Sequence, residues 1–189
     1  MKFAKNLLIL LTLLCVGCSP SGEIQNSESE PDIQLEESFE ISPSNIPPSN
    51  AGQYPAAGEY DVNGKTFYLN DVMLNTGKYS VNTIQMKKQS SYIHNVTEMR
   101  FATLTITIMK NEYQAVMHKV PEVYVSEEVN VWNDKASHTS EHDNGDSIVY
   151  TFDGLLDYKY YKIANESSYA QYVTSITWTN KNSTVCAIF

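Results

Sequence analysis

The chain has 189 residues, of which 42% are hydrophobic, and it carries 22 Asp and Glu against 13 Lys and Arg, for a formal net charge of −9. This length is enough for one domain with an appended tail. The acidic balance, with Arg100 as the one arginine, lacks the basic surface of a nucleic-acid-binding protein and disfavours direct attraction to anionic lipid headgroups.

The N-terminus has the parts of a bacterial export signal. Lys2 and Lys5 provide a basic start, residues 7–16 form a largely apolar run, and the small Gly17 stands directly before Cys18. This run is too short for a membrane-spanning helix, which needs about 20 apolar residues. Residues 1–17 are therefore predicted to be a cleaved signal peptide.

The segment Cys15-Val16-Gly17-Cys18 resembles the lipobox of bacterial lipoproteins, although Cys15 stands where leucine is usual. The resemblance implies cleavage before Cys18, a diacylglyceryl group on its sulfur, and a mature protein anchored in a cell-envelope membrane by that lipid. Ser19 after the cysteine, in place of Asp, implies by the same resemblance an outer-membrane location in a Gram-negative organism.

Residues 18–58 are predicted to form a lipidated, acidic and disordered tether. From residue 19 onward this stretch contains seven acidic residues, six prolines and eight serines, but no Lys or Arg. Its apolar residues, such as Ile24, Leu35 and Phe39, are too scattered to bury a core, so the entropy cost of folding is not offset. The expected role of the tether is to hold the folded part away from the membrane.

Residues 59–189 are predicted to form an all-β domain, an antiparallel sandwich or small barrel of about nine strands. The strongest local signal is Asn63-Gly64, which lies between two strand-like segments and is typical of a type I′ hairpin. The clearest strand is Phe101–Met109, in which apolar residues alternate with threonines.

The rest of this domain supplies the other predicted strands. Glu127 has the same parity as the valines around it, which predicts a bulge or bend there rather than a buried, unpaired carboxylate. A short helix near Val81–Val96 is the main alternative to a strand in that region. The remaining strands are expected over Tyr79–Met86, Tyr113–His118, Val123–Trp132, Ser147–Phe152, Tyr158–Ile163, Gln171–Trp178 and Thr184–Phe189.

The loop Asn133–Asp146 contains the candidate metal ligands His138, His142 and Asp143. Two imidazoles four residues apart could share a metal ion if the loop formed one helical turn. The oxygen-rich segment 143–146 could instead favour calcium, but neither set matches an established motif. The favoured interpretation is a solvated polar hairpin tip, and no cofactor is expected.

Aromatic residues offer a second candidate site. The chain has 13 tyrosines, and the candidate ligand-binding residues are Trp132, Tyr158, Tyr160 and Trp178. Aromatic rings on an exposed sheet face can stack against a sugar ring or receive a partner protein. The competing interpretation is that Tyr and Trp are simply favoured in strands, where they cover the edges of a small core.

The sequence contains no nucleophile elbow, phosphate-binding loop or zinc-protease helix, so the chain is predicted not to be an enzyme. The leading hypothesis is a lipid-anchored cell-envelope protein whose β-domain binds a protein, a glycan or a small ligand. The alternative is a metal-binding envelope module, with or without metal-dependent catalysis, built on the loop 133–146.

Overall fold

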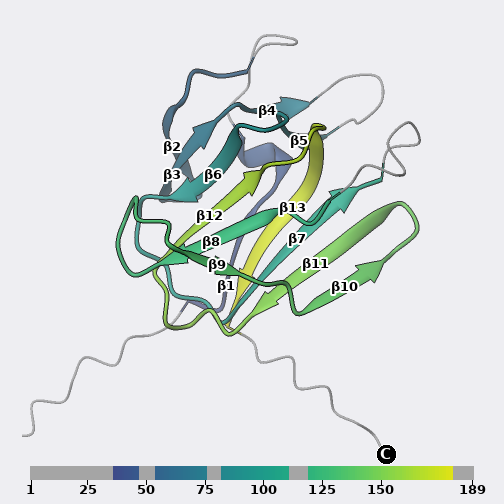
Figure 1. Cartoon of the computed structure of the whole chain (residues 1–189). Coiled ribbons are helices and arrows are strands. Elements are labelled where there is room, and N and C mark those ends of the chain that lie inside the picture. Colours follow the sequence, from purple (N-terminus) through teal and green to yellow (C-terminus); the bar gives the residue numbers. More distant parts are fainter. Residues whose placement is uncertain (1–35, 47–53, 76–81, 111–118, 181–189) are drawn as a thin grey trace, which may run out of the picture. The chain divides into compact units, whose positions relative to one another are not determined.

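The computed structural model describes residues 36–46, 54–75, 82–110 and 119–180. In these ranges the chain forms thirteen strands and one 3-10 helix, η1 (Pro43–Asn45). The strands form two antiparallel sheets that enclose one core as a β-sandwich (Figure 1). The all-β prediction is confirmed, and of the two predicted architectures the chain adopts the sandwich. Within the described ranges, no helix is long and apolar enough to cross a lipid bilayer.

One sheet has seven strands. They are β1 (Ser38–Ile41), β4 (Val72–Asn75), β5 (Thr83–Met86), β7 (Thr103–Met109), β10 (Ser140–Asp143), β11 (Ser147–Asp153) and β13 (Gln171–Thr179). Their order is β10-β11-β7-β13-β5-β4, and β1 also pairs with β13. Figure 1 shows β7, β11 and β13 running side by side.

The other sheet has six strands. They are β2 (Gly58–Val62), β3 (Lys65–Asn70), β6 (Ser91–Asn95), β8 (Glu122–Ser126), β9 (Asp134–Ala136) and β12 (Tyr160–Asn165). Their order is β2-β3-β6-β12-β8-β9. This sheet carries the candidate functional site.

The core is built from alternate residues of both sheets. In β7, Leu104, Ile106 and Ile108 are buried and the residues between them are half-buried, as the sequence alternation predicts. In β3, Phe67 and Leu69 are buried in the same way. Because successive strand residues point to opposite faces, each strand also presents an outward set, which is mainly threonine on β7.

The predicted hairpin at Asn63-Gly64 is confirmed. Val62 pairs with Lys65, which leaves a two-residue loop between β2 and β3. Asn63 has φ 52° and Gly64 has φ 80°. Positive φ at both central positions is what a type I′ turn requires, and Asn and Gly tolerate it best. This turn fixes the register of β2 on β3.

The predicted tether boundary is wrong for residues 38–46. Ser38–Ile41 forms β1, which pairs with β13, and Phe39, Ile41 and Ile46 are buried in the core. The physical reason is local alternation: β1 reads polar, apolar, polar, apolar, and its two apolar side chains enter the sandwich. The folded domain therefore includes this strand. Residues 1–35 of the predicted signal peptide and tether lie outside the described residues.

The region Val81–Val96 contains two strands, β5 and β6, rather than the helix that was the alternative there. The strand predicted over Val123–Trp132 ends at Ser126 as β8. It is followed by a bend in which Glu127 is exposed, which confirms the predicted bend and keeps that carboxylate out of the core.

Three further predicted strands are confirmed, with small shifts at their ends. Those over Ser147–Phe152, Tyr158–Ile163 and Gln171–Trp178 correspond to β11, β12 and β13. The strands predicted over Tyr113–His118 and Thr184–Phe189 lie outside the described residues, as does Cys18.

Candidate functional site

The outer face of the six-stranded sheet carries a row of directly paired side chains that crosses every strand. Paired residues of neighbouring antiparallel strands lie on the same face. In β3 and β6 the adjacent residues Leu69 and Ile93 are buried in the core, so this row must face outward. From β2 to β9 the row consists of Glu59, Tyr68, His94, Lys162, Tyr124 and Lys135.

Four residues of this row combine with Tyr92 of β6 and with Trp132, which follows β8, to form one surface. Tyr68, Tyr92, Tyr124, Trp132 and Lys162 are half-buried, whereas His94 is only 5% exposed. We call this surface the aromatic face and define it by six residues: Tyr68, Tyr92, His94, Tyr124, Trp132 and Lys162.

The rings of the aromatic face pack against one another. The ring centroids of Tyr68 and His94 are 5.3 Å apart with an interplanar angle of 13°, and those of Tyr68 and Tyr92 are 6.0 Å apart at 11°. Trp132 is tilted against His94 at 5.2 Å and 58°. His94 therefore forms the floor of the cluster, and the two tyrosines and the tryptophan surround it.

Lys162 lies between two tyrosines of the aromatic face. Its Nζ is 4.7 Å from the ring centroid of Tyr92 and 5.5 Å from that of Tyr124. Both distances are within the range of a cation–π interaction. The alkyl stem of Lys162 starts from β12, directly opposite His94.

The carboxylates beside Tyr124 are engaged by neighbouring groups. The Tyr124 hydroxyl donates a 2.6 Å hydrogen bond to Glu166 Oε1, and this bond raises the pKa of Tyr124 to about 12. Glu122 forms an ion pair with Lys135 of β9. Tyr124 is therefore a neutral, fixed edge of the aromatic face across the physiological pH range.

Burial lowers the pKa of His94 below its ordinary value of 6.5, and the nearby Lys162 charge acts in the same direction. The Asn95 carbonyl, 3.2 Å from Nδ1, and Glu59 oppose this shift. His94 is therefore held mainly in its neutral form at neutral pH. A neutral imidazole can pack under three aromatic rings without a buried charge.

The lowered pKa of His94 predicts a loss of stability in mild acid. In the unfolded chain the imidazole of His94 takes up a proton at its ordinary pKa of 6.5, which lies above its pKa in the folded protein. The free energy that neutral His94 contributes to folding is therefore fully present above about pH 6.5 and is lost as the pH falls through the folded-state pKa. We expect the free energy of unfolding, measured with denaturant, to fall less between about pH 7.5 and pH 5 for His94→Phe than for the wild type. His142→Phe, at an exposed histidine, is the control and should keep the wild-type slope. Equal slopes for wild type and His94→Phe would contradict this account.

The structure gives different positions to the four predicted ligand-binding residues. Trp132 lies in the aromatic face, and Tyr160 is half-buried on the outer side of β12, two residues before Lys162. Tyr158 precedes β12 and packs against the core instead. Trp178 is 0% exposed and its ring packs against other core aromatics, so its assignment to an exposed ligand face is wrong.

A β-bulge explains the error at Trp178. The pairing of β13 with β7 shifts register between Val173 and Ser175, and both Val173 and Ile176 are buried. The inward set therefore changes from odd to even residue numbers within one strand. Trp178 follows the second set into the core, which simple alternation along the strand does not reveal.

The ligand-binding residues predicted from the sequence did not include Tyr68, Tyr92, His94, Tyr124 and Lys162. The sequence could have predicted that two of these face outward, because Tyr68 alternates with the apolar residues of β3 and Tyr124 alternates with the valines of β8. Alternation within a strand does not predict the order of the strands in the sheet, which decides which outward residues become neighbours. The pairing of β6 between β3 and β12 brings the residues together, and that pairing is long-range.

The candidate metal ligands do not form a site in the described residues. His142 and Asp143 are adjacent in β10 and so point to opposite faces, and Asp143 forms an ion pair with Lys110. His138 lies before β10, with its ring 6.0 Å from that of Tyr150. Throughout the ranges that the structure describes, no group of three or more His, Cys, Asp or Glu side chains could hold a metal ion.

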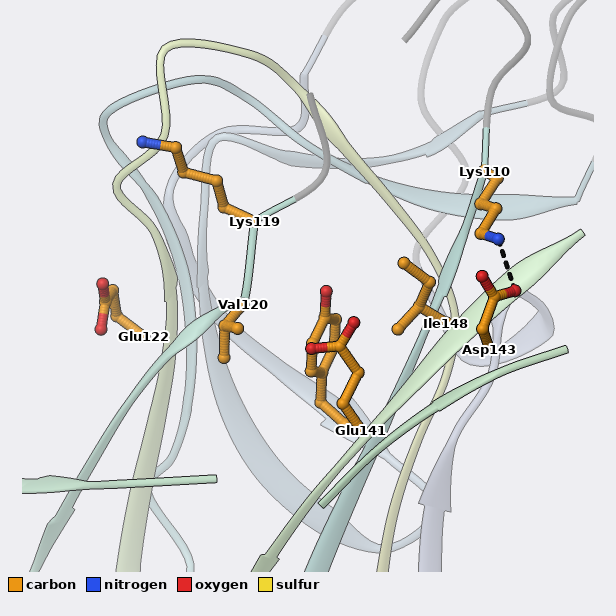
Figure 2. Close-up of a pocket in the computed structure, with 8 residues that line it drawn as sticks. Lys110, Lys119, Val120, Glu122, Glu141, Asp143 and Ile148 are labelled. Atoms are coloured by element: carbon orange, nitrogen blue, oxygen red, sulfur yellow. Dashed lines mark hydrogen bonds and ion pairs between the residues drawn. The ribbon is translucent and has the colours of Figure 1, made fainter. Parts of the chain in front are cut away.

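An open pocket of about 700 Å³ lies at another edge of the sandwich. Figure 2 shows the Lys110–Asp143 ion pair on one of its sides and Lys119 with Glu122 on the other. Its remaining lining residues are Val120, Glu141, Ile148 and Tyr150. Residues 111–118, which lie between Lys110 and Lys119 in the chain, are outside the described residues.

Comparisons with protein-family models and with curated protein sequences found no match to this chain. The functional interpretation therefore depends on the chain's own residues, and above all on the aromatic face.

Proposed function

We propose that this chain is a lipid-anchored cell-envelope protein whose β-sandwich binds a glycan through the aromatic face. The anchor is supported by the export signal and by the lipobox-like segment that ends at Cys18. The binding role is supported by one observation in particular, the cluster of half-buried rings on the outside of the six-stranded sheet. No catalytic step is part of the proposal.

Cross-strand packing by itself accounts for only part of the aromatic face. Tyr68 and His94 are directly opposite each other, and such aromatic pairs stabilise a sheet. Trp132, however, lies beyond the end of β8 and still reaches the ring of His94. A half-exposed indole placed over a sheet by a loop is the arrangement expected of a contact surface.

The polar groups of the aromatic face favour a sugar over a protein partner. Among the described residues, the hydroxyls of Tyr68 and Tyr92 and the indole N–H of Trp132 have no hydrogen-bond partner in the protein. The centre of a protein–protein interface is usually depleted of charge, whereas this face contains Lys162. A saccharide offers both apolar C–H faces for the rings and hydroxyls for these free polar groups.

The face is also extended enough for more than one sugar unit. Its residues come from β3, β6, β12 and β8, which are consecutive neighbours in the sheet. Three inter-strand spacings correspond to about 14 Å. An oligosaccharide lying across the strands would therefore contact Tyr68 at one end and Tyr124 at the other.

Tryptophan fluorescence gives a direct test, because the two tryptophans differ completely in exposure. Trp132 is half-buried in the aromatic face, while Trp178 is 0% exposed in the core. We expect a bound glycan to change the emission of Trp132 and to protect it from a soluble quencher. The Trp132→Phe variant should lose this signal while keeping the emission of Trp178.

The same titrations measure the contribution of the tyrosines. We expect Tyr92→Ala to weaken glycan affinity about tenfold, since a well-packed aromatic contact typically contributes more than 1 kcal/mol to binding. Tyr169→Ala removes an exposed tyrosine outside the aromatic face and is the matched control. If no saccharide in a panel of neutral and acidic oligosaccharides perturbs Trp132, the proposed function is wrong.

A further inference from the structure

Lys162 differs from the other lysines that the structure describes. Five of those form ion pairs with carboxylates: Lys65, Lys87, Lys110, Lys135 and Lys159. Lys88 and Lys119 have no such pair but are exposed to solvent. Lys162 is half-buried, and within the described part of the chain its ammonium group contacts only the rings of Tyr92 and Tyr124.

A half-buried cation without a counter-ion is unfavourable, because burial removes part of its hydration. The cation–π contacts of Lys162 offset part of this cost, and a carboxylate would add the counter-ion that the described residues do not supply. The two carboxylates beside Tyr124 do not form an ion pair with Lys162: Glu122 pairs with Lys135, and Glu166 accepts a hydrogen bond from the Tyr124 hydroxyl. Glu59 lies three strands away, on β2, which corresponds to about 14 Å.

Building on the proposed function, we infer that the glycan bound by the aromatic face is acidic and that its carboxylate pairs with Lys162. A sugar ring would stack on Tyr92 and Trp132, while its carboxylate accepts charge-assisted hydrogen bonds from the ammonium group. The free donors of the aromatic face, which include the hydroxyl of Tyr92 beside Lys162, suit a ligand rich in acceptor oxygens. The ligand class is therefore a uronic-acid-containing oligosaccharide.

The acidic character of the whole chain does not oppose this inference. Its formal charge is −9, but exposed charges are screened over about 8 Å at physiological ionic strength. The charged groups at and around the aromatic face are Lys162, the ion pair of Lys135 with Glu122, and the carboxylates of Glu166 and Glu59. Of the two lysines in this set, Lys162 is the one without a carboxylate partner among the described residues. An acidic envelope protein with one unpaired lysine inside its aromatic surface would select ligands that place their charge at that point.

The test compares ligands that differ only in charge. Oligosaccharides of galacturonic and glucuronic acid are titrated beside their carboxyl-reduced, neutral forms, with Trp132 emission as the signal. The wild type is expected to bind the acidic forms about tenfold more tightly at low salt, the effect of one charge-assisted pair. This preference should shrink as the salt concentration rises.

The lysine variants assign the preference to one residue. Lys162→Gln should bind the acidic and neutral forms equally well, whereas Lys162→Arg should keep the preference. Lys159→Gln removes a lysine that is paired with Glu98 outside the aromatic face and should behave as the wild type does. Circular dichroism and melting curves verify that each variant is folded.

The possible failures are distinguishable. If the wild type binds acidic and neutral forms equally, or if Lys162→Gln keeps the preference, the inference about Lys162 is overturned while the glycan-binding function stands. If neither form perturbs Trp132, the proposed function fails and the inference fails with it.

Discussion

Replacing Phe39 by alanine is expected to lower the free energy of unfolding by about 3–5 kcal/mol, the usual cost of truncating a buried phenylalanine. Phe39 is 5% exposed, and its ring centroid is 5.6 Å from that of Phe67 and 5.8 Å from that of Trp178. The truncation would leave a cavity where β1, β3 and β13 meet. Denaturant unfolding of the protein measures the effect.

Leu156→Ala is the matched control, because Leu156 is a large apolar residue that is 44% exposed. Its truncation should change the free energy of unfolding by less than about 1 kcal/mol. A Phe39→Ala variant as stable as the wild type would mean that residues 38–41 do not belong to the folded domain. Such a result would restore the tether boundary at residue 58 that composition alone predicts.

The example of β1 shows where composition misleads. The stretch around Phe39 is acidic and rich in proline and serine, and these averages are typical of disorder. A strand of four residues needs only two inward apolar side chains, so its alternation is too short to stand out. Partners distant in sequence supply the stabilisation: β13 provides the hydrogen bonds, and Phe67 provides the ring contact.

Local signals predicted the elements whose structure is determined by nearby residues. Asn63-Gly64 specified its hairpin because positive φ is a property of those two residues, and β7 was visible because its alternation continues through the whole strand. The aromatic face depends instead on strand order. It is assembled by the placement of β6 between β3 and β12, which no single segment encodes.

Buried asparagines illustrate a second kind of information that the sequence pattern does not show. Asn95 is 0% exposed, although asparagine is usually found at the surface. It ends β6 and lies beside the start of β12. Its side chain satisfies the backbone N–H of Tyr161, which would otherwise be buried without a partner, so it helps to determine how the two central strands of the aromatic face meet.

Asn95→Ala is expected to lower the free energy of unfolding by about 3 kcal/mol or more. The side-chain oxygen accepts a 2.6 Å hydrogen bond from the Tyr161 N–H, and its nitrogen donates to the carbonyls of Thr97 and Lys159, each at 2.8 Å. The substitution leaves the buried Tyr161 N–H without a partner, which costs about 1–3 kcal/mol, and removes two further hydrogen bonds worth about 0.5–1.5 kcal/mol each. The Lys159 carbonyl still accepts a hydrogen bond from the Met99 N–H.

Asn70→Ala is the control for the loss of a single asparagine hydrogen bond. Asn70 is half-buried on the same sheet and donates one 2.9 Å bond to the Ser90 carbonyl, in an exposed position where water can replace it. Its replacement should cost about 1 kcal/mol or less. If denaturant unfolding shows equal losses for the two variants, Asn95 does not join β6 to β12 in the way its contacts indicate. A much larger loss for Asn95→Ala would mean that the geometry of the aromatic face depends on a polar residue beneath it.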